Sequence, residues 1–125
     1  MGRTILCIDD DHETLKLRKY VLEASAYAVI TASSGREAFQ ILSDGQSVDI
    51  VVLDYFMPEM KGDEVAKELR SQYPHVPIVV MSAFPDIPRA LLNMVDGYVP
   101  KGQDPEVLIE VIGKALAKSN PPTNI

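Results

Sequence analysis

Short apolar runs alternate along the chain with longer stretches in which apolar residues recur at helical spacing. The runs at residues 5–8, 50–53 and 78–81 (ILCI, IVVL and IVVM) contain no polar position, which is typical of parallel strands covered by helices on both faces. The pattern predicts strands at residues 4–8, 27–31, 48–53, 76–81 and 98–99, and helices at residues 11–25, 34–42, 62–72, 87–95 and 104–118. Because strands alternate with helices, we expect an α/β fold in which five helices cover a doubly wound, five-stranded parallel sheet.

Local signals support several of the helix boundaries. Ser34 is a suitable N-cap, and Glu37 three places later completes a capping box. Pro105 suits the first position of the last helix, with Asp104 as its cap. On the first helix, the apolar positions near helical spacing predict an inward-facing stripe made of Leu15, Leu17, Val21 and Leu22.

Length, charge and cysteine content limit the class of protein. The 125 residues suit one domain, which we expect at residues 1–118, followed by a polar, Pro-containing tail or linker start at 119–125. The formal charge of −6 disfavours direct binding to nucleic acid. The single cysteine, Cys7, lies in an apolar run, which favours a buried thiol in a reducing compartment. No leader and no apolar stretch of about 18 residues is present, so we expect a cytoplasmic protein without membrane contact.

Polar residues follow the ends of four of the predicted strands. They are Asp9 and Asp10, then Asp54, then Ser82, and then Lys101. Since ligands bind beyond the carboxyl ends of parallel strands, we expect these side chains to converge at one edge of the sheet. Neighbouring carboxylates repel one another. A hard divalent cation such as Mg²⁺ would offset that repulsion, and Lys101 would offset it further.

Two other charged groups have simpler interpretations. Asp11 stands at the start of the first predicted helix, where a carboxylate complements the helix dipole. Lys16, Arg18 and Lys19 form a basic cluster on that helix. We interpret this cluster as a solvated face, with a contribution to docking a kinase domain as the alternative.

The strand-end motifs together resemble the receiver domain of two-component response regulators, as found in chemotaxis regulators. The segment VVLDYFMPEMKG matches the pattern D-x-x-M-P-x-M-x-G at Asp54, Met57, Pro58, Met60 and Gly62. ILCIDDD before this segment, and IVVMSA and GYVPK after it, have the order and spacing of the family's other motifs, so the likeness covers residues 4–118. The resemblance implies the flavodoxin-like strand order 2-1-3-4-5. It also implies a partner histidine kinase or phosphotransfer protein and a controlled output protein or domain, which the sequence does not identify.

The resemblance also implies a role for each matching residue. Asp54 would be the phosphoacceptor, and Lys101 would bind a phosphoryl oxygen. Asp9 and Asp10 would hold Mg²⁺ together with Asp54 and the backbone carbonyl of Phe56. Ser82 and Tyr98 would be the switch pair that rearranges after phosphorylation.

The sequence departs from the usual receiver pattern near its C-terminal half. Gly102 follows the lysine where proline is usual, so we expect a trans Lys101–Gly102 bond. Only 19 positions separate Ser82 from Lys101, which predicts a shortened fourth helix and an altered output surface. The resemblance implies that Phe56 and Phe84 flank the approach of water to the phosphoryl group, while the small Ala83 leaves room for that group; the alternative is that Phe84 packs away from the site. Because phenylalanine cannot orient a water molecule, we expect slow dephosphorylation.

Two other functions remain as alternatives. A phosphohydrolase of the haloacid dehalogenase type would need a second acidic residue two places after Asp54, and Phe56 stands there. A degenerate receiver would bind its partner without phosphorylation. The presence of Asp9, Asp10, Asp54, Ser82 and Lys101 argues against this second alternative.

Overall fold

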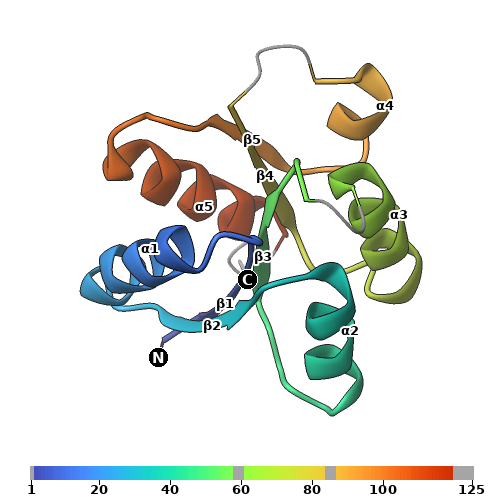
Figure 1. The fold of residues 1–125 in the computed structure, drawn as a ribbon, viewed down its shortest axis with the longest axis horizontal. Helices are drawn as coiled ribbons and strands as arrows, with labels where there is room; N and C mark the ends of the chain where they lie inside the picture. Colours follow the sequence, from blue (N-terminus) through green and yellow to red (C-terminus); the bar gives the residue numbers. More distant parts are fainter. Residues whose placement is uncertain (1, 58–60, 84–86, 120–125) are drawn as a thin grey trace, which may run out of the picture.

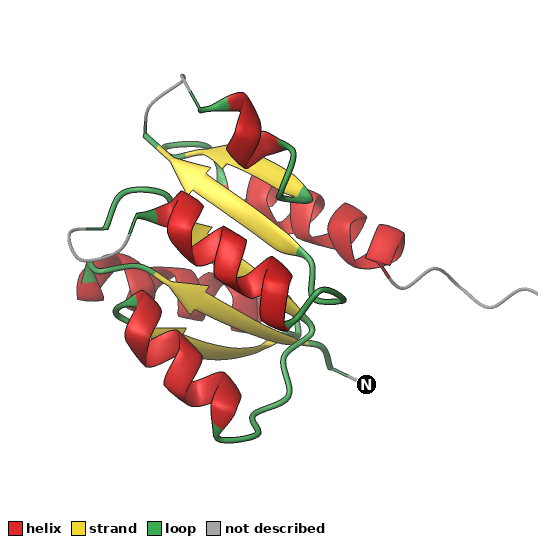
Figure 2. Cartoon of the chain, turned by 90° about the vertical axis from the view of Figure 1, so that its right-hand side faces the viewer, coloured by secondary structure: helices red, strands yellow, loops and turns green. Residues whose placement is uncertain are grey.

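The sheet has five parallel strands in the order β2-β1-β3-β4-β5. The computed structural model describes residues 2–57, 61–83 and 87–119. The strands are β1 (Thr4–Ile8), β2 (Ala28–Ala32), β3 (Ile50–Asp54), β4 (Ile78–Ser82) and β5 (Gly97–Pro100). Their arrowheads all point the same way in Figure 2. The fold class and the flavodoxin-like strand order are therefore confirmed.

Five helices cover the two faces of the sheet. They are α1 (His12–Ala24), α2 (Gly35–Ser43), α3 (Gly62–Gln72), α4 (Arg89–Leu92) and α5 (Pro105–Ser119). Helices α1 and α5 lie on one face, and α2, α3 and α4 lie on the other (Figure 1). Alternate residues of the strands feed two buried cores, with Ile5 and Cys7 on the α1/α5 side and Leu6 and Ile8 on the other. Burial on both faces explains why the runs at residues 5–8, 50–53 and 78–81 contain no polar position.

The bounds of β1 and α3 are as predicted from the sequence, and those of the other elements differ from the predictions by one to three residues. The strands β3 and β4 extend one residue further than predicted, so that Asp54 and Ser82 are their last residues. Pro77 precedes β4. The N-cap Ser34 accepts a hydrogen bond from the amide of Glu37 at 3.0 Å. The Glu37 carboxylate accepts a hydrogen bond from the amide of Ser33 and not from that of Ser34. The expected capping box is therefore shifted by one residue.

The inward face of α1 is composed differently from the prediction. Leu15 and Leu22 are buried, but Leu17 is 66% exposed. Arg18 is buried at 8% exposure, so the interpretation of Lys16, Arg18 and Lys19 as one solvated cluster is wrong. The inward positions follow the helical spacing Leu15, Arg18, Leu22, and this places a cation where the stripe would hold an apolar side chain.

Helix α4 contains four residues, so the prediction of a shortened fourth helix is confirmed, although it occupies less of the predicted 87–95 segment. Leu91 is its one buried residue. Arg70 of α3 ties the turn after α4 to the turn before β4. Its Nε donates to the carbonyl of Met94 at 2.7 Å and its Nη1 to the carbonyl of Val76 at 3.3 Å, and its Nη2 pairs with Asp96.

We expect Arg70→Met to lower the free energy of unfolding by about 2–3 kcal/mol, because it removes charge-assisted hydrogen bonds and leaves partly buried carbonyls without a donor. Urea unfolding would measure the change. Lys67→Met is the matched control, since Lys67 is exposed on the same helix. A loss below about 0.5 kcal/mol for Arg70→Met, the range of an ordinary surface substitution, would contradict the prediction.

Candidate functional site

Three carboxylates meet at the carboxyl edge of the sheet. Asp9 follows β1, Asp10 comes next, and Asp54 ends the neighbouring strand β3. One oxygen of each residue lies within 4.8 Å of the other two. Asp9 is fully buried and Asp54 is 2% exposed, whereas Asp10 is exposed. The convergence predicted for these three side chains is therefore present.

Lys101 joins this cluster from the end of β5. Its Nζ lies 2.7 Å from Asp54 Oδ1 and 3.8 Å from Asp9 Oδ2. The backbone amide of Lys101 donates to the carbonyl of Ser82 at 2.8 Å, which aligns the ends of β4 and β5. The buried Asp54 Oδ1 makes the ion pair with Lys101 but no hydrogen bond within the described part of the chain.

The groups around Asp54 have opposing effects on the pKa of its carboxyl. Burial raises the pKa of the Asp54 carboxyl above its ordinary value, and the negative charges of Asp9 and Asp10 add to that increase. The Lys101 ammonium acts in the opposite direction because it stabilises the ionised form. A further cation at this edge would favour the ionised carboxylate that nucleophilic chemistry requires.

Arg18 is the site residue that the sequence interpretation missed. Its Nη1 donates to Asp9 Oδ2 at 3.2 Å, and the two side chains are 7% and 1% exposed. The signal was present in the sequence, since a charged residue stands three places after Leu15 and four before Leu22 on one helical face.

Asp11 does not belong to the cluster. It is the N-cap of α1, where its carboxylate accepts hydrogen bonds from Thr14 Oγ1 at 2.7 Å and from the amide of Glu13 at 3.2 Å. The hydrogen bond from Thr14 is the main cause that lowers the pKa of Asp11 below its ordinary value. The prediction of a helix-capping role is confirmed.

The other predicted site residues surround this edge. Ser82 is 2% exposed at the end of β4, and Tyr98 is half-buried on β5. Phe56 is 55% exposed, and its ring meets that of Tyr55 edge-on at 5.4 Å between centroids. Ala83 is exposed. Phe84, Pro58 and Met60 lie outside the described residues.

The loop after Asp54 depends on a close backbone approach at Gly62. The Gly62 amide donates to the carbonyl of Tyr55 at 2.8 Å. A Cβ atom at position 62 would lie 2.7 Å from the Cα of Tyr55, so a side chain cannot be placed there without moving the backbone. The Lys101–Gly102 bond is trans, as predicted, and Gly102 has a φ of +90°, which glycine adopts readily.

The donor set of the cluster suits a hard divalent cation. It offers carboxylate oxygens from three residues on a rigid sheet edge, one of them exposed to solvent. Mg²⁺ is bound in proteins by a few carboxylates and keeps several water molecules. The residues present therefore fit Mg²⁺.

Comparison with known proteins identifies the family. The sequence matches the family described as response regulator receiver domain over residues 5–113. It is 33% identical to the transcriptional regulatory protein GlrR of Escherichia coli, over 96% of this chain and 28% of that protein. It is 32% identical to the response regulator SaeR of Staphylococcus aureus, over 91% of this chain and 50% of that protein. The chain thus spans half or less of the length of these relatives.

Solved structures agree with this assignment. A receiver domain from Clostridium thermocellum superposes with a TM-score of 0.85 at 29% identity, over 93% of this chain and 95% of that one. The response regulator TrrA of Thermotoga maritima, in complex with Mg²⁺ and BeF, has a TM-score of 0.84 at 31% identity, over 90% and 98% of the two chains. The chain belongs to the response regulator receiver family. Within the part of the chain that the structure covers, no helix has the length and apolar character needed to cross a membrane.

We expect the Cys7 thiol, which lies in the buried strand β1, to be inert in the native protein. Cys7 is 0% exposed, and burial raises its pKa from 9.0 to about 12. At pH 8, its reaction with a disulfide reagent should be at least about 100-fold slower in the folded chain than in urea, because neither access nor thiolate is available.

The same shift predicts a pH effect on stability. Well below pH 9 the thiol is neutral in both states and has no effect. Between about pH 9 and 12 only the unfolded chain ionises, so Cys7 lowers the free energy of unfolding as the pH rises. Cys7→Ala is the control that lacks this component. A Cys7 thiol that reacts as fast in the folded chain as in urea would refute the prediction that it is inert.

Proposed function

We propose that this chain is a phosphoacceptor that takes a phosphoryl group from a histidine kinase or phosphotransfer protein onto Asp54. The reaction depends on Mg²⁺, and the modified domain changes conformation to control an output protein or domain. The observation that carries the proposal is the position of Asp54, which is buried at a strand end, 2.7 Å from Lys101 and within 4.8 Å of the Asp9 and Asp10 oxygens.

The chemistry is one phosphoryl transfer. A carboxylate oxygen of Asp54 attacks the phosphorus of the phosphohistidine, and the new O–P bond forms as the P–N bond breaks. The electron pair of that bond returns to the imidazole, which leaves neutral when its other nitrogen carries a proton. The ammonium of Lys101, which pairs with Asp54 beforehand, then pairs with a phosphoryl oxygen.

Phosphoryl transfer needs positioning and charge neutralisation more than acid–base groups. Asp9, Asp10, Asp54 and the backbone carbonyl of Phe56 would hold Mg²⁺. When bound, Mg²⁺ supplies positive charge against the phosphoryl oxygens. The rigid ends of β1 and β3 support this role, because they keep the carboxylates together in the absence of the ion.

Ser82 and Tyr98 are the proposed switch. Ser82 ends β4, hydrogen-bonded through its backbone to Lys101, so its hydroxyl belongs to the same sheet edge as Asp54. Tyr98 lies on the adjacent strand and packs against the core that contains Leu91. A hydroxyl that moves toward the phosphoryl group would open space into which the Tyr98 ring turns.

The proposal implies a signalling protein of the cytoplasm and not an enzyme with a separate substrate. The chain catalyses its own phosphorylation and a slow loss of the phosphoryl group. The domain is proposed at residues 1–118, with 119–125 as a tail or linker start. The α5 helix reaches Ser119, and residues 120–125 lie outside the described part. A degenerate receiver, which binds a partner without phosphorylation, is the alternative.

We expect Asp54→Asn to abolish the mass gain that acetyl phosphate and Mg²⁺ produce in the parent chain. Acetate leaves as the O–P bond to Asp54 forms, so the amide, which is not a nucleophile here, stops the reaction. Intact-protein mass spectrometry measures the gain. Asp11→Asn is the matched control and should be modified normally, because Asp11 caps α1.

The outcomes separate the candidate functions. A stable mass gain supports the phosphoacceptor, and steady release of phosphate from excess acetyl phosphate supports a phosphohydrolase. If neither result is observed, the degenerate receiver is supported. Undiminished modification of Asp54→Asn would refute the assignment. Full modification in excess EDTA would refute the Mg²⁺ dependence.

We expect the phosphoryl group to be lost slowly, because Phe56 cannot hydrogen-bond to the attacking water. Phe56→Asn should speed the decay of the purified phosphoprotein at least about threefold, roughly 0.7 kcal/mol of activation free energy. Phe84→Lys is a companion variant, and Tyr20→Asn, at an exposed aromatic of α1, is the control. If neither polar variant decays faster than the parent, the phenylalanines do not limit access of water.

A further inference from the structure

A buried arginine is uncommon in a core face, and Arg18 lies on such a face of α1. Its side chain is 7% exposed, between Leu15 and Leu22 on the inward side of the helix. Charged side chains are buried only when they are paired, because the loss of hydration is costly. The partner of Arg18 is Asp9, so the presence of this cation in the core depends on the acidic site.

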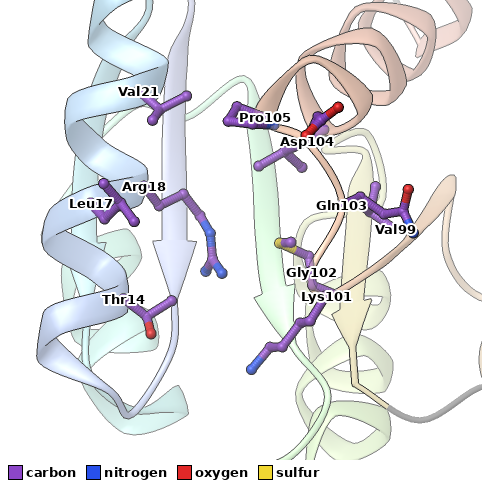
Figure 3. A pocket seen from close by; sticks show the side chains of 12 residues that line it. Thr14, Leu17, Arg18, Val21, Val99, Lys101, Gly102, Gln103, Asp104 and Pro105 are labelled. Carbon is purple, nitrogen blue, oxygen red and sulfur yellow. The ribbon is translucent and has the colours of Figure 1, made fainter.

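Arg18 and Lys101 reach Asp9 from two different elements. Both line a cavity of about 320 Å³ between α1 and the segment that follows β5. Figure 3 shows the two side chains extending into the space between these elements, Arg18 from α1 and Lys101 from beyond β5. They converge on one oxygen, since Asp9 Oδ2 is 3.2 Å from Arg18 Nη1 and 3.8 Å from Lys101 Nζ.

Protein donors already occupy both oxygens of Asp9. Oδ1 accepts a hydrogen bond from the backbone amide of Asp11 at 3.0 Å, and Oδ2 accepts one from Arg18. The carboxylate is therefore held in one orientation by the start of α1 and by its second turn. By contrast, Asp10 is exposed. Asp54 Oδ1 has an ion pair with Lys101 but no hydrogen-bond donor within the described residues.

The charges at the site nearly balance without a metal ion. When ionised, Asp9, Asp10 and Asp54 contribute three negative charges. Against them, Arg18 lies within 4 Å of Asp9, and Lys101 lies within 4 Å of both Asp9 and Asp54. With Lys101 alone the site would have a net charge of about −2, and with Arg18 as well it has a net charge of about −1. A divalent cation is therefore attracted by about one negative charge. Electrostatic attraction scales with that charge and is strengthened by partial burial.

We propose that Arg18 is a positioning residue that acts as a permanent counter-cation of the acidic site, holding Asp9 and limiting the affinity of the site for Mg²⁺. This inference rests on the proposed Mg²⁺ site. It predicts that Arg18 and the metal ion neutralise the same charge, so that loss of one increases the dependence on the other. The domain thereby remains folded without metal at the cost of weaker metal binding.

Arg18→Gln tests the charge separately from the hydrogen bond, because glutamine keeps an N–H donor and removes the cation. We expect its Mg²⁺ dissociation constant, measured by NMR titration of backbone amides without any phosphodonor, to be at least about tenfold lower than that of the parent. Its urea midpoint should also rise more steeply with Mg²⁺ concentration than the parent's does. Arg18→Lys keeps the charge and should stay within about threefold of the parent.

Lys16→Gln is the matched control, since it removes a positive charge from an exposed position of the same helix. Solvent and salt screen that charge, so the dissociation constant should stay within about threefold of the parent. If Arg18→Gln does not fold without metal, its Mg²⁺ concentration at half refolding gives an upper bound on the dissociation constant, because binding must also drive folding. A bound at least about tenfold below the parent's dissociation constant would meet the expectation. Failure to refold at any concentration, while Arg18→Lys folds and binds normally, would overturn the proposal.

The result also distinguishes this inference from the proposed function. Equal dissociation constants for the parent and Arg18→Gln would overturn the role of Arg18 and leave the Mg²⁺ site standing. An equal tightening in Lys16→Gln would overturn it too, because the effect would be one of total charge. Absence of Mg²⁺ binding in the parent and in every variant would overturn both proposals.

Discussion

The structure depends on holding like charges together at one edge of a sheet. Asp9 follows β1 and Asp54 ends the neighbouring parallel strand β3, and folding removes both carboxylates from water. A buried carboxylate is tolerated only when cations or hydrogen bonds offset its lost hydration. Lys101 and Arg18 provide those cations from opposite sides of the site, one from the end of β5 and one from the core face of α1. The charges of the buried carboxylates are thus offset by cations of the chain itself.

The order of the strands determines which groups can take part. The strands β1 and β3 are neighbours, so Asp9, Asp10 and Asp54 meet directly, and β4 and β5 follow in order beside them. The hydrogen bond between the amide of Lys101 and the carbonyl of Ser82 brings the final strand level with β4. Gly62 allows the chain after Asp54 to turn back close to Tyr55, which returns it to α3. Each of these features acts on the backbone and places a side chain without contacting the reacting groups.

The short α4 helix distinguishes the second half of the domain from the first. Of the described residues between β4 and β5, only the four of α4 form a helix, and Arg70 of α3 binds the Met94 carbonyl and Asp96 in this region. This arrangement stabilises the turn before β5, the strand that carries Tyr98 and leads to Lys101. The chain spans half or less of the length of the relatives that it matches.

The sequence by itself determined the alternation of strands and helices, the burial of the central strands and the set of residues at the strand ends. Those features depend on local spacing and on residue type, which are visible along one chain. Boundaries were less accurate, because Asp54 and Ser82 look like loop residues until their backbone pairs with a neighbouring strand. Only the tertiary structure showed that Arg18 pairs with Asp9. A basic residue beside two others on a helix is ordinarily interpreted as part of a solvated surface. The burial of Arg18 follows from the packing of α1 against Asp9, and no local pattern in the sequence specifies that pairing.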